Sequence, residues 1–187
     1  MIARHHRARR YVVRVRPDGA IRLTVPRGAS VSGGLAFVQR QADWIARERQ
    51  RQQHLALSWR AGSTVWFRGE RVRVIEDGFD ARVRALAEDE LPPRCCELAL
   101  EHGVAIAGVA VRNQRSRWGA CSPRGAITLN WRLIQMPPAV SDYVIVHELM
   151  HTRCLDHSRR FWREVACACP GWREAERWLR RHGREIL

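Results

Sequence analysis

The segment from Pro138 to about Arg153 constrains the fold most, because it predicts a buried helix that carries ionisable side chains. Proline is favoured in a first helical turn, so Pro137 and Pro138 mark the start of this helix. His147 and His151 are four residues apart and therefore project from one face, one turn above the other. The apolar positions that predict a largely buried helix are Val140, Tyr143, Val144, Val146, Leu149 and Met150.

His147, Glu148 and His151 form an HExxH pattern. Two imidazoles on one helical face can bind the same cation, and the glutamate beside them can reach a water bound to that cation. The alternative is that these are ordinary core histidines and that Glu148 pairs with an arginine. A carboxylate between two imidazoles on a buried helix would be costly without a cation nearby. The pattern therefore predicts a zinc site in which Glu148 acts as general base.

Catalytic zinc commonly has three protein ligands and one open position, and His157 is the candidate for the third ligand. In an uninterrupted helix, His157 would lie about 15 Å along the axis from His147, too far to share a metal. The chain must therefore leave the helix between Thr152 and Asp156 and fold back. No glycine lies in this stretch, so we expect a non-glycine residue, best Asp156, in the left-handed conformation. A following helix over 158–169 would begin with Ser158 as N-cap.

The rest of the chain predicts an α+β fold. Apolar and polar residues alternate over 11–26 on both sides of a Pro-Asp-Gly turn, which is typical of a β-hairpin. We expect a β-rich N-terminal region with one long helix over 1–78, and over 79–187 a domain in which the histidine-bearing helix lies beside a small antiparallel sheet. The further predicted elements are a helix over 31–57, two strands in 63–77 that turn at Gly69, a helix over 81–102, and strands over 108–113 and 127–133.

The net charge of +14 is high, and all 33 basic residues are arginine. Such a charge makes nucleic acid a possible partner. The arginines are spread along the whole chain, however, which favours a bias in composition over a binding stripe. Nucleic-acid binding is therefore a possible but not a favoured interpretation.

The six cysteines are irregularly spaced, which predicts reduced thiols and no disulfide framework. The sequence has no run of about eighteen apolar residues, so we expect no membrane span. Its N-terminus is charged and lacks the features of a secretory signal, which predicts a cytoplasmic protein. The oligomeric state is not indicated.

The sequence resembles the YgjP-like metallopeptidase family of bacteria and archaea over nearly its whole length. The resemblance is carried by QRSRWGACS at 114–122, LNWRLI at 129–134, PPAVSDYVIVHELMH at 137–151, DHSRRFW at 156–162 and the closing WLRRHG. That family belongs to the HExxH-bearing zincins and is distantly similar to SprT-like proteases, which act on DNA-bound proteins.

The resemblance implies a zincin-like fold and a zinc-dependent hydrolase, with His147, His151 and His157 as metal ligands and Glu148 as catalytic base. Two positions depart from the family pattern. Asp156 stands where the family usually has asparagine, which adds negative charge beside the third histidine, and Ala120 stands where it often has serine.

Three functions are compatible with these residues. The favoured one is a zinc metallopeptidase that acts on peptides or proteins. Members of the resembled family have also been described as nucleotide pyrophosphatases acting on UTP, and an arginine-rich cleft would suit a triphosphate, although no glycine-rich phosphate loop is visible. The third is a non-catalytic nucleic-acid-binding module with a structural metal, which requires a fourth ligand such as Cys154 or Cys121.

For the peptidase, the strand over 127–133 would offer an edge to which an extended substrate adds as another strand. Peptide hydrolysis also needs a group that stabilises the developing oxyanion. Arg115, Arg117 and Tyr143 are the candidates, and the residues alone do not decide among them. The aromatic residues Trp118, Trp131, Phe161 and Trp162 are expected to pack around the site and not to contact substrate.

Overall fold

The computed structural model describes residues 1–16, 19–57 and 59–187, with only the backbone for 52–57. Helices and small sheets alternate along the chain, so the fold is α+β, as predicted. The chain forms two compact units, Met1–Ser58 and Trp59–Leu187. No helix in the part of the chain that the structure describes is both long and apolar enough to cross a membrane.

The first unit contains a three-stranded sheet in the order β1-β3-β2. The predicted hairpin is formed by β2 (Val12–Val15) and β3 (Ile21–Pro26), which pair antiparallel. The Pro-Asp part of its turn lies outside the described residues. Strand β1 (Ile2–His5), which pairs parallel with β3, was not predicted. Its four residues include a single large apolar side chain and show no alternation.

The single helix predicted over 31–57 is two helices, α1 (Val31–Arg40) and α2 (Ala42–Leu57). Helical geometry is interrupted at Gln41, where φ is −98° and ψ is 12°. Helix α1 approaches the sheet closely, since a Cβ at Gly34 would lie 2.9 Å from Leu23 Cδ2. Leu23 therefore faces the helices, together with the apolar residues of its own sheet face.

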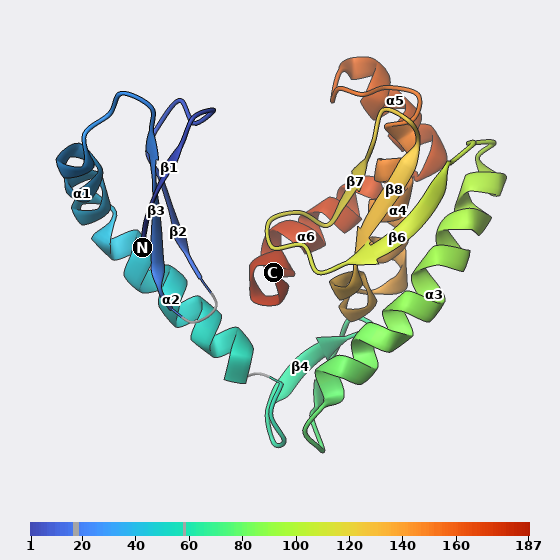
Figure 1. The fold of residues 1–187 in the computed structure, drawn as a ribbon. Helices are drawn as coiled ribbons and strands as arrows, with labels where there is room; N and C mark the ends of the chain where they lie inside the picture. The colour runs from blue at the N-terminus through green and yellow to red at the C-terminus, as the bar shows by residue number, and fades with distance from the viewer. Residues whose placement is uncertain (17–18, 58) are drawn as a thin grey trace. The chain divides into compact units, whose positions relative to one another are not determined.

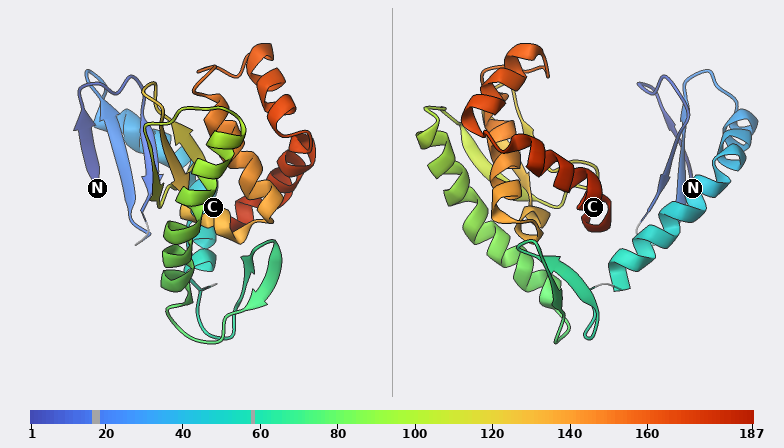
Figure 2. Two further views of the ribbon diagram at one scale, coloured as in Figure 1. Left: turned by 90° about the vertical axis from the view of Figure 1, so that its right-hand side faces the viewer. Right: turned by 180° about the vertical axis from the view of Figure 1, so that it is seen from behind.

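The second unit contains a hairpin, a three-stranded sheet and most of the helices (Figures 1 and 2). Its elements are β4 (Thr64–Phe67), β5 (Glu70–Arg73), α3 (Phe79–Glu101), β6 (Gly108–Arg112), β7 (Gly119–Cys121), β8 (Ala126–Asn130), the 3₁₀ helix η1 (Trp131–Gln135), α4 (Pro138–Met150), α5 (Arg159–Ala168) and α6 (Trp172–Ile186). The order of the sheet is β6-β8-β7. It is mixed and not purely antiparallel as expected, because β6 pairs parallel with β8 while β7 pairs antiparallel with it.

The strand predicted over 127–133 ends at Asn130, because the side chain of Asn130 caps η1 by accepting a hydrogen bond from Arg132 N. Helix α4 contacts β7 and β8 as well as α5 and α6, and Figures 1 and 2 show it between the sheet and α6. Nine of its 13 residues are buried. The histidine-bearing helix is therefore the centre of the core, as its apolar sequence predicts.

The hairpin β4–β5 belongs to this second unit, whereas the sequence analysis grouped it with the region 1–78. Its tip donates two backbone hydrogen bonds to η1, from Arg68 N to Ile134 O and from Gly69 N to Gln135 O, each 3.0 Å long. Both tip residues have positive φ, 50° and 85°, which is typical of a two-residue type I′ turn. The turn at Gly69 was predicted, and these contacts place it against the start of α4.

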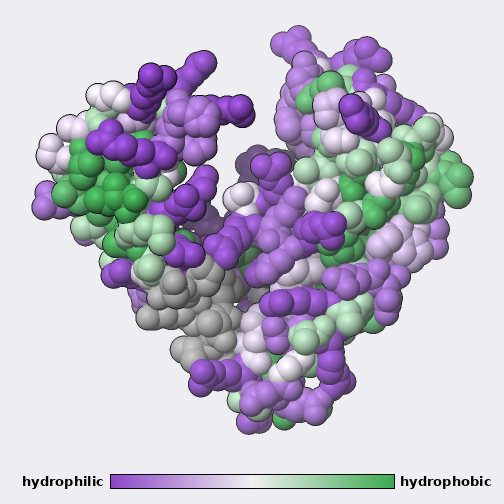
Figure 3. Space-filling view, viewed as in Figure 1, coloured by the Kyte–Doolittle hydropathy of each residue, from purple (hydrophilic) through white to green (hydrophobic). Residues whose placement is uncertain are grey.

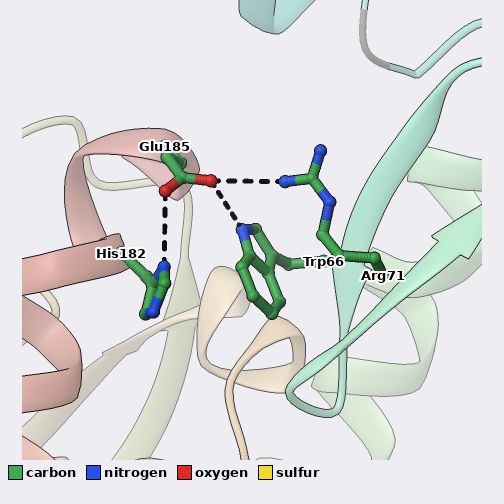
Figure 4. A network of polar contacts seen from close by, with 4 residues as sticks. All are labelled: Trp66, Arg71, His182 and Glu185. Atoms are coloured by element: carbon green, nitrogen blue, oxygen red, sulfur yellow. Dashed lines mark hydrogen bonds and ion pairs between the residues drawn. The ribbon is translucent and has the colours of Figure 1, made fainter.

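Figure 4 shows a second connection of this hairpin, to the end of α6. Glu185 accepts hydrogen bonds from Trp66 Nε1 at 3.0 Å and from Arg71 Nη1 at 3.2 Å, and its other oxygen lies 3.3 Å from His182 Nδ1. These groups lower the pKa of Glu185, with the bond from Trp66 as the largest cause. Because the carboxylate is about half exposed, its ion pair adds little stability, and the packed ring of Trp66 is the stronger contact.

Gly69→Ala tests the contact between the hairpin tip and α4. A Cβ at Gly69 would lie 2.6 Å from Pro137 Cγ and 3.0 Å from its Cα, in addition to the strain of a positive φ. Gly78 has nearly the same φ, 83°, and nothing within 4 Å, so Gly78→Ala isolates the strain alone. We expect a loss in the free energy of unfolding of about 1 kcal/mol for Gly78→Ala and about 2–4 kcal/mol for Gly69→Ala in urea denaturation. Equal losses would contradict the close approach.

Candidate metal centre

The end of α4 places two of the predicted ligands together. His147 lies in the last helical turn and His151 is the C-cap residue, so their rings are one turn apart, with centroids separated by 5.1 Å. Glu148 follows His147 and is only 8% exposed. As the HExxH spacing predicts, His147 and His151 therefore lie together on one face at the end of the helix, beside Glu148.

The helix ends at Met150, and the chain turns at once. His151 N, Thr152 N and Arg153 N donate to the carbonyls three residues earlier, at 3.0 to 3.2 Å, which tightens the last turn into 3₁₀ geometry. The break before Asp156 was predicted, but the left-handed residue was not found. Within residues 1–16, 19–57 and 59–187, Arg68 is the one non-glycine residue with positive φ. The tightened turn makes a strained residue unnecessary.

The N-cap of α5 fixes how the chain turns back toward the end of α4. Ser158 is the N-cap of α5, as predicted, and its hydroxyl accepts a hydrogen bond from Phe161 N at 3.5 Å. Asp156 Oδ1 accepts one from Ser158 N at 3.1 Å. The side-chain bond to Ser158, and after it this backbone bond, lowers the pKa of the Asp156 carboxyl. His157 is held between these two residues. Its Nε2 lies 3.0 Å from His147 Nε2.

The nitrogens of His147, His151 and His157 all lie within 4.8 Å of one another, and such a group could hold a metal ion. Zinc–nitrogen bonds are about 2.0–2.1 Å long, so two ligands of a tetrahedral zinc lie about 3.3 Å apart. The 3.0 Å between His147 and His157 is close to this separation. No other histidine, cysteine, aspartate or glutamate of the described residues joins the group, including Cys121 and Cys154.

The surroundings of His147 and His151 favour the neutral imidazole that binds metals. Burial, together with the charges of the neighbouring His151 and His157, lowers the pKa of His147 to about 4. Burial also lowers the pKa of His151. The Nδ1 of His151 lies 3.0 Å from Cys154 O and must donate there, since a carbonyl only accepts, which leaves Nε2 as the free ligand atom.

Phe161 forms the apolar support of the three rings. It is fully buried, and its ring centroid lies 4.8 Å from His147, 4.5 Å from His151 and 4.9 Å from His157. Trp162 follows it on α5 and stacks on Trp172 at 4.9 Å. These two aromatic residues pack around the site, as expected. Trp131 does not, because its ring contacts Trp59 in another part of the core.

The carboxylate of Glu148 lies against the backbone of β7. A Cβ at Gly119 would be 2.5 Å from Glu148 Cγ and 2.8 Å from its Oε1, so only glycine allows this approach. Burial raises the pKa of Glu148 to about 7, and the charge of Arg117 opposes the shift. Gly119 lies within QRSRWGACS, but no local pattern distinguishes it there, because its contact joins residues that are distant in the chain.

Asn130 is a second residue whose importance only the structure reveals. It is fully buried, and its amide donates to Gln114 O at 2.8 Å and to Arg117 O at 3.0 Å. Its backbone N donates to Trp118 O at 2.8 Å. Asn130 thereby holds the loop that leads into β7. Trp118 extends this support to α6, since its ring would lie 3.2 Å from a Cβ at Gly183.

The prediction that the strand over 127–133 offers an edge for an extended substrate is wrong about which strand lies at the edge. Strand β8 is the central strand and has neighbours on both sides, so the free edge beside Glu148 belongs to β7. Of the three oxyanion candidates, Tyr143 is 4% exposed, and burial raises its pKa to about 12. Arg115 and Arg117 are exposed on the loop before β7, and the charge of Arg117 acts on Glu148.

Comparisons with known proteins place this centre in a family. A model described as "YgjP-like, metallopeptidase domain" matches residues 9–79 and 75–182. No curated protein matches the chain. A solved structure, the metallopeptidase zymogen of Pyrococcus abyssi abylysin, is 24% identical, with 51% of this chain and 97% of that chain covered and a TM-score of 0.44. The family match spans both the histidine-bearing helix and most of the N-terminal unit, and the chain therefore belongs to the YgjP-like metallopeptidase family.

Proposed function

We propose that the chain is a zinc-dependent peptidase in which His147, His151 and His157 hold the ion and Glu148 is the general base. The observation that carries this proposal is the convergence of three imidazoles beside one buried carboxylate. Three imidazole nitrogen ligands suit zinc and leave its fourth position open for water or substrate. A zinc ion bound there would polarise the scissile carbonyl and lower the pKa of the attacking water toward 7.

Glu148 moves the proton in this proposal. Its carboxylate accepts a proton from the attacking water and transfers it to the leaving amine. Two features support this role: the carboxylate is buried on the same helix turn as the first ligand, and Gly119 leaves it room to point along β7. Burial also makes this carboxylate a stronger base than an exposed one, and no ion pair with a described residue offsets the effect.

The edge of β7 is our proposed binding site for the substrate backbone. An extended peptide that pairs with Gly119–Cys121 would bring its carbonyl past Glu148, because a Cβ at Gly119 would already touch that side chain. Among the oxyanion candidates we favour Arg117, since it is exposed on the loop held by Asn130 and its charge acts on Glu148. The alternative of a closed structural metal is disfavoured, because no fourth His, Cys, Asp or Glu ligand joins the group among the described residues.

Glu148→Gln separates metal binding from catalysis. We expect zinc content, measured by elemental analysis, to stay near one per chain, because the ligands are unchanged. Casein or fluorogenic-peptide hydrolysis should fall by about 10²–10⁴-fold with loss of the base. The control is Glu164→Gln, which removes a carboxylate of α5 that pairs with Arg153 at 2.8 Å, and should keep near wild-type turnover.

A Glu148→Gln variant with wild-type peptidase activity would refute the role of the base. If the wild-type protein hydrolysed UTP but no peptide, the substrate class would be a nucleotide and the peptidase proposal would fail. Both assays therefore belong in the same series, with zinc-loaded protein throughout.

His157→Ala tests the third ligand. Because two imidazoles rarely suffice for catalytic zinc, the variant should lose most bound zinc on dialysis and with it peptide hydrolysis. His6→Ala, which removes an exposed histidine of the N-terminal unit, is the matched control and should keep both. Full zinc stoichiometry and activity in His157→Ala would exclude this residue as a ligand.

Gly119→Ala tests the position of the base without changing any titratable group. The added methyl group would displace Glu148, so we expect turnover to fall at least about tenfold while zinc content is kept. Gly171→Ala is the control, since a Cβ at Gly171 meets nothing within 4 Å. Unchanged turnover in Gly119→Ala would show that the carboxylate does not need the position seen here.

A further inference from the structure

The positive charge of the chain is concentrated in its first compact unit. Residues 1–58 contain twelve arginines and three carboxylates, which is a net charge of +9. The remaining 129 residues contain 21 arginines and 16 carboxylates, a net charge of +5. Less than a third of the chain therefore carries most of the net charge of +14, although arginines occur along the whole sequence.

The strand register places arginines on the sheet face opposite the helices. Leu23 points to α1, as its closeness to Gly34 shows, and its cross-strand partner is Val13. Neighbouring residues of a strand point to opposite faces, so Arg14 and Arg22 occupy the other face, where they are directly opposite each other. Both are exposed. Arg16 follows β2 with the same alternation and is exposed too.

Further arginines flank this face. The connection between β1 and β2 carries Arg7, Arg9 and Arg10, all exposed, at the end of the sheet where His5 pairs with Pro26. Figure 3 shows hydrophilic residues over the strands of this unit and apolar residues over α1. We call the set of Arg7, Arg9, Arg10, Arg14, Arg16 and Arg22 the arginine face.

No carboxylate offsets the arginine face within the described residues. None of its six arginines forms an ion pair there, and Asp43 and Glu48 lie on α2 in the helical layer. The third carboxylate of the unit, Asp18, lies outside the described residues. Like charges directly opposite on two strands destabilise a sheet. The pair Arg14–Arg22 therefore costs folding free energy that a bound polyanion would offset.

We propose that the arginine face binds the phosphate backbone of nucleic acid. Guanidinium groups match phosphate oxygens with two parallel hydrogen bonds, and a row of them fits a repeating anion better than a single acidic group. Alternation also places Ala3, His5, Val12, Thr24 and Pro26 on this face, and among these strand positions the exposed imidazole of His5 is the one ring that can stack on a base. Stacking on a ring tolerates every base and so adds no sequence readout. The face therefore binds without reading sequence, and its affinity falls steeply with salt.

The test uses the full-length protein and a fluorescein-labelled duplex of about 24 base pairs, with binding followed by fluorescence anisotropy over a range of salt concentrations. Each phosphate contact contributes about one to the slope of log K against log salt. Arg14→Gln/Arg22→Gln should lower the slope by about two and weaken binding at least about tenfold at low salt. Arg177→Gln/Arg180→Gln removes the same charge from α6 and should change affinity by less than about twofold.

Loss of folding is excluded by a melting curve of each variant without DNA. Removal of the Arg14–Arg22 repulsion should leave the melting temperature of the double variant unchanged or raise it, and Arg14→Lys/Arg22→Lys should restore most of the binding. DNA binding requires no peptide hydrolysis, so the outcome of the binding measurement does not depend on whether the chain is a peptidase.

Three results would overturn the proposal. Equal weakening in both double variants would assign binding to the overall charge and not to this face. Binding to phosphatidylserine vesicles without binding to duplex would assign the face to a membrane. A strong preference between two unrelated duplex sequences would contradict backbone recognition.

Discussion

The central constraint on the second unit is the burial of the Glu148 carboxylate beside three imidazoles. An ionisable carboxylate in a core is costly unless a charge or a hydrogen-bonding partner compensates it. Here Glu148 is 8% exposed, and burial lowers the pKa of His147 and of His151, so these two imidazoles do not supply that charge. A cation held by the three rings would supply it. The surrounding structure can be understood as the means by which three distant segments keep this group together.

Each of these segments is held in place by its own local turn, cap or close contact. The tightened turn after Met150 and the cap at Ser158 return the chain so that His157 faces His147. Asn130 holds the loop before β7, and Gly119 lets that strand pass directly over the carboxylate. The hairpin tip at Gly69 fixes the start of α4 at the opposite end of the helix.

The sequence predicts well what depends on local periodicity. The hairpins, the N-cap at Ser158, the helix over α4 and the meeting of its histidines were confirmed, because spacing along a helix or strand determines which side chains share a face. The ligand role of His157 stays a prediction, although the required turn is present. The helix predicted over 81–102 is α3, and it continues through Pro92 and Pro93.

What the sequence did not predict depends on contacts between distant segments. Strands β1 and β7 have only four and three residues and no clear alternation, so their pairing partners define them. The parallel pairing of β6 with β8 and the edge position of β7 depend on the path of the chain between these strands. No local sequence pattern encodes that path. The same holds for the arginine face, which appears only once the strand register separates Arg14 and Arg22 from the core side.

The most direct test of the central claim is X-ray absorption spectroscopy of the zinc-loaded protein, supported by a crystal structure with the anomalous signal of the metal. The account predicts four-coordinate zinc with three imidazole nitrogens, from His147, His151 and His157, at about 2.0–2.1 Å and one oxygen from water. The Glu148 carboxylate should lie within hydrogen-bond distance of that water. A sulfur or carboxylate from the protein in the fourth position, or zinc bound without His157, would contradict it.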